Sequence, residues 1–164
     1  MSLKIVKGDL IKMAKAGEFD VITHGCNCFC AMGAGIAPLM ARAFGCDEFK
    51  LEQEIYKGKM GKLGCIDWMK VGQLFVVNSY TQYGPGMPGR YGIPLDYDAL
   101  SLCLAKINHE FARQRVGLPF IGAGLAGGNP EKIVHLMMAN LQDVDATLVI
   151  FEDHLYEIAK KIVG

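Results

Sequence analysis

Two glycine-rich segments contain the residues of this chain best suited to bind a ligand. The first runs from His24 to Ala37 (HGCNCFCAMGAGIA), and the second runs from Ile121 to Pro130 (IGAGLAGGNP). Each follows a β-like run and leads into a helix. Glycine lets backbone N–H groups approach a ligand closely, and the first turn of a helix carries a partial positive charge. The two segments therefore predict a cradle for two linked phosphates.

Three polar residues lie where strands are expected to end. His24 could transfer a proton or donate a hydrogen bond to a phosphate, and a buried imidazole bonded to the backbone is an equal alternative. The amide of Asn27 suits a sugar hydroxyl, or else forms a turn. Asp9 could accept a hydrogen bond from an adenine amino group, or cap the segment that follows.

Other phosphate-handling motifs do not fit. In the string GAGIAP, Pro38 stands where a dinucleotide-binding fingerprint needs its third glycine, and the sequence has no GxxxxGK[ST] motif. No cysteine is followed six positions later by arginine, as a cysteine-nucleophile phosphatase loop requires. Asp143 and Asp145 form a DxDxT string, but it precedes a strand, so we interpret it as a solvated turn.

Cys26, Cys28 and Cys30 form a CxCxC pattern that could hold a soft metal in principle. Zinc sites usually have wider spacing and a second ligand pair, and neither is present. We therefore interpret these thiols as small buried residues on one side of an extended segment, and predict no metal site.

Composition predicts one domain over residues 1–164. The chain is 51% hydrophobic, which is enough for one buried core, and its seventeen basic residues balance seventeen acidic ones. This balance argues against a broad surface for nucleic acid or membrane. With no signal peptide and no apolar run long enough to cross a bilayer, we expect a cytoplasmic protein with reduced thiols.

Predicted strands and helices alternate along the chain. The strands are expected at residues 3–6, 20–25, 73–80, 116–121 and 147–151. The helices are expected at 35–44, 48–62, 96–115, 130–141 and 154–163, and residues 81–95 form a long loop. This order is typical of an α/β domain whose helices cover a largely parallel sheet. Ligands in such sheets bind beyond the carboxyl ends of the strands, where both glycine-rich segments would lie.

The chain resembles the macro domain family of ADP-ribose-binding modules. The matching strings are Lys7-Gly-Asp9-Leu10, His24-Gly-Cys-Asn27-Cys28, Met32-Gly-Ala-Gly-Ile-Ala37 and Ile121-Gly-Ala-Gly-Leu-Ala-Gly-Gly128. Their order and spacing cover nearly the whole chain. The resemblance implies a three-layer α/β/α fold with a mixed, largely parallel sheet of about six strands.

The resemblance also implies roles for individual residues. Asp9 would hold the adenine amino group and Phe151 would lie against the adenine, while residues 33–37 and 122–126 would wrap the pyrophosphate and the distal ribose. Asn27 would lie beside the distal ribose. We predict His24 and Asn27 as the catalytic residues, with His24 as the acid/base or phosphate-orienting group, and we expect no cofactor. The implied ligand-binding residues are Asp9, Leu10, Met32, Gly33, Ala34, Gly35, Ile36, Ala37, Ser79, Tyr80, Thr81, Tyr83, Gly122, Ala123, Gly124, Leu125, Ala126, Gly127 and Phe151.

Within the family, the chain is most similar to the branch that dephosphorylates ADP-ribose 1″-phosphate. The His-x-Cys-Asn-Cys string is the shared mark, and the strings beginning at Tyr80 and Leu95 resemble phage and bacterial versions. The expected partner is ADP-ribose or its 1″-phosphate, with ADP-ribosylated protein as a further ligand. Two alternatives stay open: a binding module without turnover, and an ADP-ribosyl hydrolase. Ser79 and Ala126 replace the residues of the lysine-dependent hydrolases, so such a hydrolase would need another mechanism.

Overall fold

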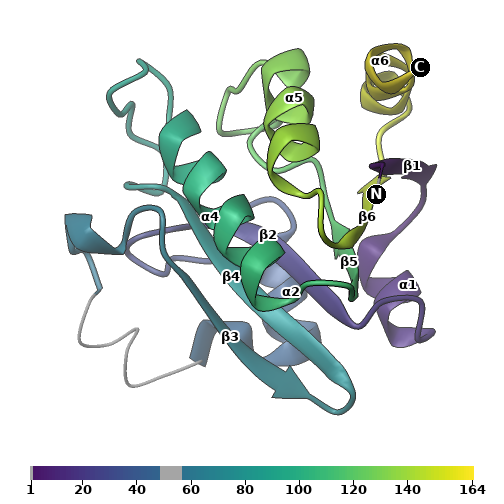
Figure 1. Cartoon of the computed structure of the whole chain (residues 1–164). Coiled ribbons are helices and arrows are strands. Elements are labelled where there is room, and N and C mark those ends of the chain that lie inside the picture. The colour runs from purple at the N-terminus through teal and green to yellow at the C-terminus, as the bar shows by residue number, and fades with distance from the viewer. Residues whose placement is uncertain (1, 49–56) are drawn as a thin grey trace.

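A computed structural model describes residues 2–48 and 57–164 and contains a six-stranded sheet (Figure 1). The strands are β1 (Lys4–Lys7), β2 (Val21–Asn27), β3 (Ile66–Val71), β4 (Leu74–Gln82), β5 (Arg115–Leu118) and β6 (Asp145–Ile150). Their spatial order is β1-β6-β5-β2-β4-β3, and every neighbouring pair is parallel except β3 with β4. The prediction of a mixed, largely parallel sheet is confirmed.

Helices cover both faces of this sheet. The α-helices of the described residues are α1 (Leu10–Lys15), α2 (Ala37–Phe44), α4 (Tyr97–Glu110), α5 (Pro130–Asn140) and α6 (Asp153–Val163). Two 3₁₀ turns, η1 (Cys46–Glu48) and η2 (Met60–Lys62), are also present. Helices α4, α5 and α6 pack into one apolar cluster with the sheet, and α1 and α2 pack into another. Figure 1 is seen from the side of α4 and α5, with α2 behind the sheet.

Alternation along the strands divides the core between these two layers. In β2, Val21 belongs to the cluster under α4, α5 and α6, while Ile22 belongs to the cluster under α1 and α2. In β6, Leu148 likewise belongs to the cluster under α4, α5 and α6, and Val149 to the cluster under α1 and α2. Both faces are apolar because a largely parallel sheet has helices on each side. The three-layer α/β/α arrangement follows from this alternation.

Local signals set most helix ends where they were predicted. Asp96 caps α4 by accepting a hydrogen bond from the N–H of Ala99 at 2.8 Å, and Asn129 caps α5 ahead of Pro130. Gly45 ends α2 in the left-handed conformation, with φ of 67°. No helix in the described parts of the chain has the length and apolar character needed to cross a membrane.

One predicted helix needs correction, another falls mostly outside the described residues, and two elements were not predicted. The helix expected at 96–115 ends at Glu110, because Arg115 begins β5 and forms an ion pair with Asp20 at 2.9 Å. The antiparallel edge strand β3 and the short helix α1 were not predicted. Most of the helix expected at 48–62 falls on residues 49–56, outside the described residues, and Met60–Lys62 form η2.

Gly117 offers a test of the packing between β5 and the layer of α1 and α2. A Cβ at this position would lie 2.7 Å from ring carbons of the buried Phe19. Because that ring is held in the core, we expect Gly117→Ala to lower the free energy of unfolding by about 2 kcal/mol. Chemical denaturation is the measurement, with Gly61→Ala as the control because its Cβ meets nothing within 4 Å. Equal stability of the two variants would contradict this packing.

Candidate binding cavity

A cavity of about 870 Å³ lies at the carboxyl ends of the parallel strands, as predicted. Residues following β1, β2, β5 and β6 line it, together with the last residues of β4. Both glycine-rich segments contribute to its wall, because β2 and β5 are parallel neighbours and each segment continues from one of them.

Most of the predicted site residues line this cavity. They are Asp9, Leu10, Asn27, Met32, Gly33, Ala34, Gly35, Ile36, Ala37, Thr81, Gly122, Gly124, Leu125, Ala126 and Phe151. A Cβ built on Gly33, Gly35 or Gly124 would meet no atom within 4 Å. The backbone at these glycines is therefore open to a ligand.

Five other predicted ligand-binding residues do not line the cavity. The hydroxyl of Ser79 is 2.7 Å from that of Thr23 inside the protein. The hydroxyls of Tyr80 and Tyr83 donate to Asp67 and to the Gly58 carbonyl. Ala123 and Gly127 belong to the second glycine-rich segment but also stay outside the cavity wall. Ala123 packs against the main core, and a Cβ on Gly127 would meet Ile93 at 3.3 Å.

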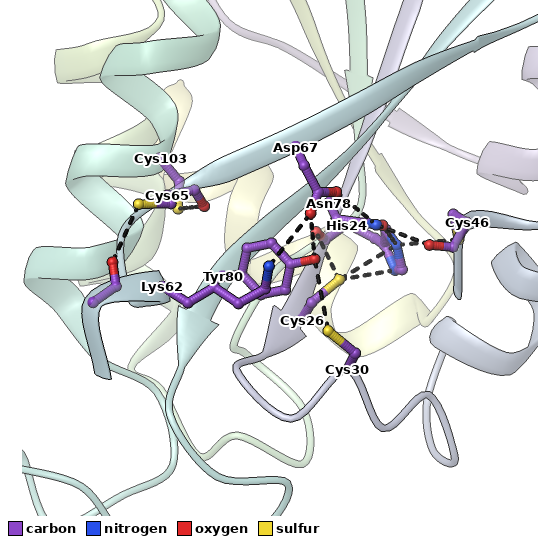
Figure 2. A network of polar contacts seen from close by, with 11 residues as sticks. His24, Cys26, Cys30, Cys46, Lys62, Cys65, Asp67, Asn78, Tyr80 and Cys103 are labelled. Carbon is purple, nitrogen blue, oxygen red and sulfur yellow. Dashed lines mark hydrogen bonds and ion pairs between the residues drawn. The ribbon is translucent and has the colours of Figure 1, made fainter. Parts of the chain in front are cut away.

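His24, which was predicted to act on a ligand, lies outside the cavity wall. Its side chain is fully buried, and its Nε2 is 2.7 Å from Oδ1 of Asn78 (Figure 2). The Asn78 amide nitrogen donates to Asp67 and to the Cys46 carbonyl, so its oxygen must accept from His24. Burial lowers the pKa of His24, and the hydrogen bond to Asn78 raises it only in part. The resulting pKa is about 4. Sequence position alone could not distinguish this buried imidazole from an exposed one.

The polar network around His24 is structural. Asp67 accepts from the Tyr80 hydroxyl at 2.6 Å and lies 3.6 Å from the ammonium of the buried Lys62 (Figure 2). Because these groups come from β3, β4 and η2, the network fixes the edge of the sheet.

The thiols near this network behave as the small buried residues that were predicted. Cys26 and Cys28 are buried against Tyr80 in a cluster of their own, with Cys30 partly buried beside them. Burial raises the pKa of Cys28 to about 12 and also raises the pKa of Cys26. The described residues contain no group of three or more histidine, cysteine or acidic side chains that could hold a metal ion.

Asn27 and Asp9 each have the structural role that was the alternative to ligand binding, while still lining the cavity. The Asn27 oxygen accepts from the N–H groups of Phe29 and Ala31, and its nitrogen donates to the Ala31 carbonyl at 2.8 Å. These bonds shape the turn that leads into the first glycine-rich segment. Asp9 caps α1 by accepting from the Lys12 N–H at 3.1 Å.

The second glycine-rich segment is shaped by Leu95, the last residue of the long loop. Leu95 is fully buried, and its N–H donates to the Ala126 carbonyl at 3.2 Å. Cβ atoms on Gly122 and Gly128 would lie 2.7 and 2.5 Å from a Leu95 methyl group. The loop expected at 81–95 therefore supports the cavity wall from behind, and its first two residues belong to β4.

The same loop is fastened to α4. Arg90 makes two hydrogen bonds, of 2.6 and 2.9 Å, to the carboxylate of Asp96, which is also the cap of α4. Tyr91 packs edge-on against Tyr97 in the first turn of that helix. These contacts fasten the part of the loop just before Leu95 to the start of α4.

Several residues of the cavity wall were not among the predicted site residues, although Gly25, Cys26, Ala31 and Ile121 belong to the two glycine-rich segments. The wall residues not predicted are Gly8, Ile11, Lys12, Lys15, Gly25, Cys26, Ala31, Leu39, Arg42, Ala43, Gln82, Pro85, Pro119, Phe120, Ile121, Val149, Glu152 and Leu155. Recognising α1 would have found Lys12 and Lys15, because they follow the Asp9 cap at helical spacing. The large apolar residues Leu39, Leu125 and Phe151 are between 50% and 79% exposed and line the cavity mouth, where an aromatic ring could lie on them.

Support of the second glycine-rich segment by Leu95 is testable at Gly122. This residue has φ of 82° and no room for a Cβ, whereas Gly124 has open space and no left-handed φ. We expect Gly122→Ala to cost about 2 kcal/mol of unfolding free energy and Gly124→Ala less than about 1 kcal/mol. Thermal unfolding of the two variants measures this. A smaller loss at Gly122 than at Gly124 would contradict the assigned packing.

Burial of neutral His24 predicts a pH dependence of stability. The unfolded chain binds a proton near pH 6.5 at this residue, but the folded protein does so only near pH 4. His24 therefore contributes stability above pH 6.5 that is lost as the pH falls toward 4, by about 3 kcal/mol.

Urea unfolding of wild type and His24→Gln at pH 7 and pH 4 tests this. The wild type should lose about 3 kcal/mol more than the variant over this interval. The same pH dependence in both proteins would show that His24 is not buried as a neutral group.

The chain is similar in sequence to a phage protein and in structure to macrodomains. No family model matches it. A bacteriophage T4 protein, an uncharacterized 17.5 kDa protein of the tk-vs intergenic region, is 30% identical over 162 residues, which cover 93% of this chain and 98% of the phage protein.

Solved structures with the same fold include macrodomains. The macrodomain of Mycobacterium tuberculosis DarG has a TM-score of 0.67 at 21% identity, covering 92% of this chain and 98% of that one. The Trypanosoma brucei macrodomain, solved in complex with ADP-ribose, has a TM-score of 0.71 at 17% identity, covering 99% and 69%. The chain therefore belongs to the family of the phage T4 protein and has the macrodomain fold.

Proposed function

We propose that this protein binds ADP-ribose in the cavity at the carboxyl ends of its strands. The observation that carries the proposal is that two glycine-rich segments, far apart in sequence, line one cavity with open space over Gly33, Gly35 and Gly124. The diphosphate lies between these segments and accepts hydrogen bonds from their N–H groups. Helix α2 begins at Ala37, where the first segment ends, and its unpaired N–H groups add to the attraction.

The adenine in this proposal lies between Asp9 and Phe151. One carboxylate oxygen of Asp9 caps α1, and the second has no partner among the described residues, so it can accept from the adenine amino group. Phe151 follows β6 and is 70% exposed at the cavity, which leaves a ring face for the base. A solved macrodomain of the same fold binds ADP-ribose, which supports this ligand class.

We propose in addition that the protein removes the terminal phosphate of ADP-ribose 1″-phosphate. This proposal rests on the resemblance of residues 24–28 to the phosphatase branch. Catalysis would depend on backbone N–H groups that stabilise the developing charge and on a positioned water, because His24 does not reach the cavity. Cys26 lines the cavity, but burial raises its thiol pKa, so it remains protonated and is not the nucleophile.

Gly33→Val tests the binding proposal. The new side chain would enter the open space over the first glycine-rich segment, where the diphosphate is expected. We expect ADP-ribose affinity to fall at least about tenfold, which is about 1.4 kcal/mol, with little change in thermal stability. Calorimetric titration with ADP-ribose, ADP and AMP is the measurement, and Gly61→Val is the control. Absence of binding heat with wild type, or unchanged affinity of Gly33→Val, would overturn the proposal.

Release of inorganic phosphate from ADP-ribose 1″-phosphate tests the finer proposal. Turnover that is lost in Gly33→Val would support the phosphatase. Binding of the compound without phosphate release would instead favour a binding module. Loss of the modification from an ADP-ribosylated protein, measured in parallel, would favour an ADP-ribosyl hydrolase.

A further inference from the structure

Three basic side chains line the cavity without an acidic partner among the described residues. Lys12 and Lys15 come from α1 and Arg42 comes from α2. Within the described residues, none of their side chains makes an ion pair or a hydrogen bond, whereas Lys4 and Lys7 on β1 are paired with acids at 2.7 and 2.9 Å. In a chain of zero formal net charge, this is a local excess of positive charge in a ligand cavity.

Two of these cations, Lys12 and Lys15, lie toward the proposed adenosine side of the cavity. Lys12 and Lys15 are three residues apart on α1 and so share one face of the helix that Asp9 caps. Arg42 lies five residues beyond Ala37, or about 7 Å along the axis of α2 from the end of the first glycine-rich segment. The two acids that line the cavity are Asp9, assigned to the adenine, and Glu152.

We infer that the cavity accepts an ADP-ribose that carries a further phosphate on its adenosine ribose. This inference rests on the proposed function, because Asp9 and Phe151 define the adenosine side. The diphosphate already has an amide cradle in the two glycine-rich segments, so it does not require these cations. A phosphate monoester carries nearly two negative charges and three acceptor oxygens, which matches three unneutralised cations. The ligand class is therefore a nucleotide phosphorylated at the 2′ or 3′ hydroxyl of adenosine.

The test compares ligand pairs that differ by one ribose phosphate. Calorimetric titration at low salt with ADP-ribose and ADP-ribose 2′-phosphate examines the 2′ position. Titration with AMP and adenosine 3′,5′-bisphosphate examines the 3′ position. In at least one pair we expect the extra phosphate to raise the affinity about tenfold, with a gain that shrinks as salt increases.

Substitution of the cations tests whether they cause this gain in affinity. In Lys12→Gln/Lys15→Gln and in Arg42→Gln, the affinity ratio within the pair should fall toward one. Lys161→Gln is the control, because this exposed cation on α6 lies outside the cavity and should leave the ratio unchanged. Comparing ratios separates the extra phosphate from any effect that the variants have on both ligands.

The outcomes distinguish this inference from the proposed function. If wild type binds ADP-ribose but the extra phosphate gives no gain in either pair, the inference is wrong and the proposed function stands. An equal loss of affinity for both ligands of a pair in the cation variants would show that the cations contact the part that the two ligands share, and would also overturn the inference. If none of the four ligands binds wild type, the proposed function itself fails.

Discussion

The parallel pairing of β2 with β5 is the constraint on which the cavity depends. Val21 pairs with Val116 and Ile22 with Gly117, so the two strands run in the same direction and end at the same edge of the sheet. The segments that follow them are far apart in sequence and become the two glycine-rich walls of one cavity. Phe19 packs closely on Gly117 and so holds β5 against the layer of α1 and α2. Each segment forms only part of the cavity wall, so the cavity depends on this pairing to bring the two segments together.

Position along β2 then decides which residues meet the cavity, because Gly25, Cys26 and Asn27 line it and His24 does not. Gly25 lines the cavity and has no room for a side chain, because a Cβ would lie 2.8 Å from Ile121 and 2.9 Å from the Thr81 hydroxyl. His24, the preceding residue, points instead into the network of Asn78 and Asp67. A one-residue difference along a strand therefore separates a structural imidazole from the binding space.

Sequence predicted the features that depend on local chemistry. Apolar runs indicated five of the six strands, Asp96 and Asn129 marked helix starts, and glycine-rich strings marked the cavity wall. Features that depend on tertiary contacts were missed. The edge strand β3 has little apolar alternation and exists through its pairing with β4. The partners of His24 and Tyr80 come from residues more than ten positions away, so their burial had no local signal.

The central claim is that a diphosphate binds between the two glycine-rich segments. Amide chemical shifts recorded during titration of the ¹⁵N-labelled protein with ADP-ribose test this claim most directly. The account predicts that the largest shifts occur at the amides of Gly33, Gly35 and Gly124, with smaller changes in β3 and at the far ends of α4 and α5. Saturable binding with shifts confined to other parts of the molecule would contradict it.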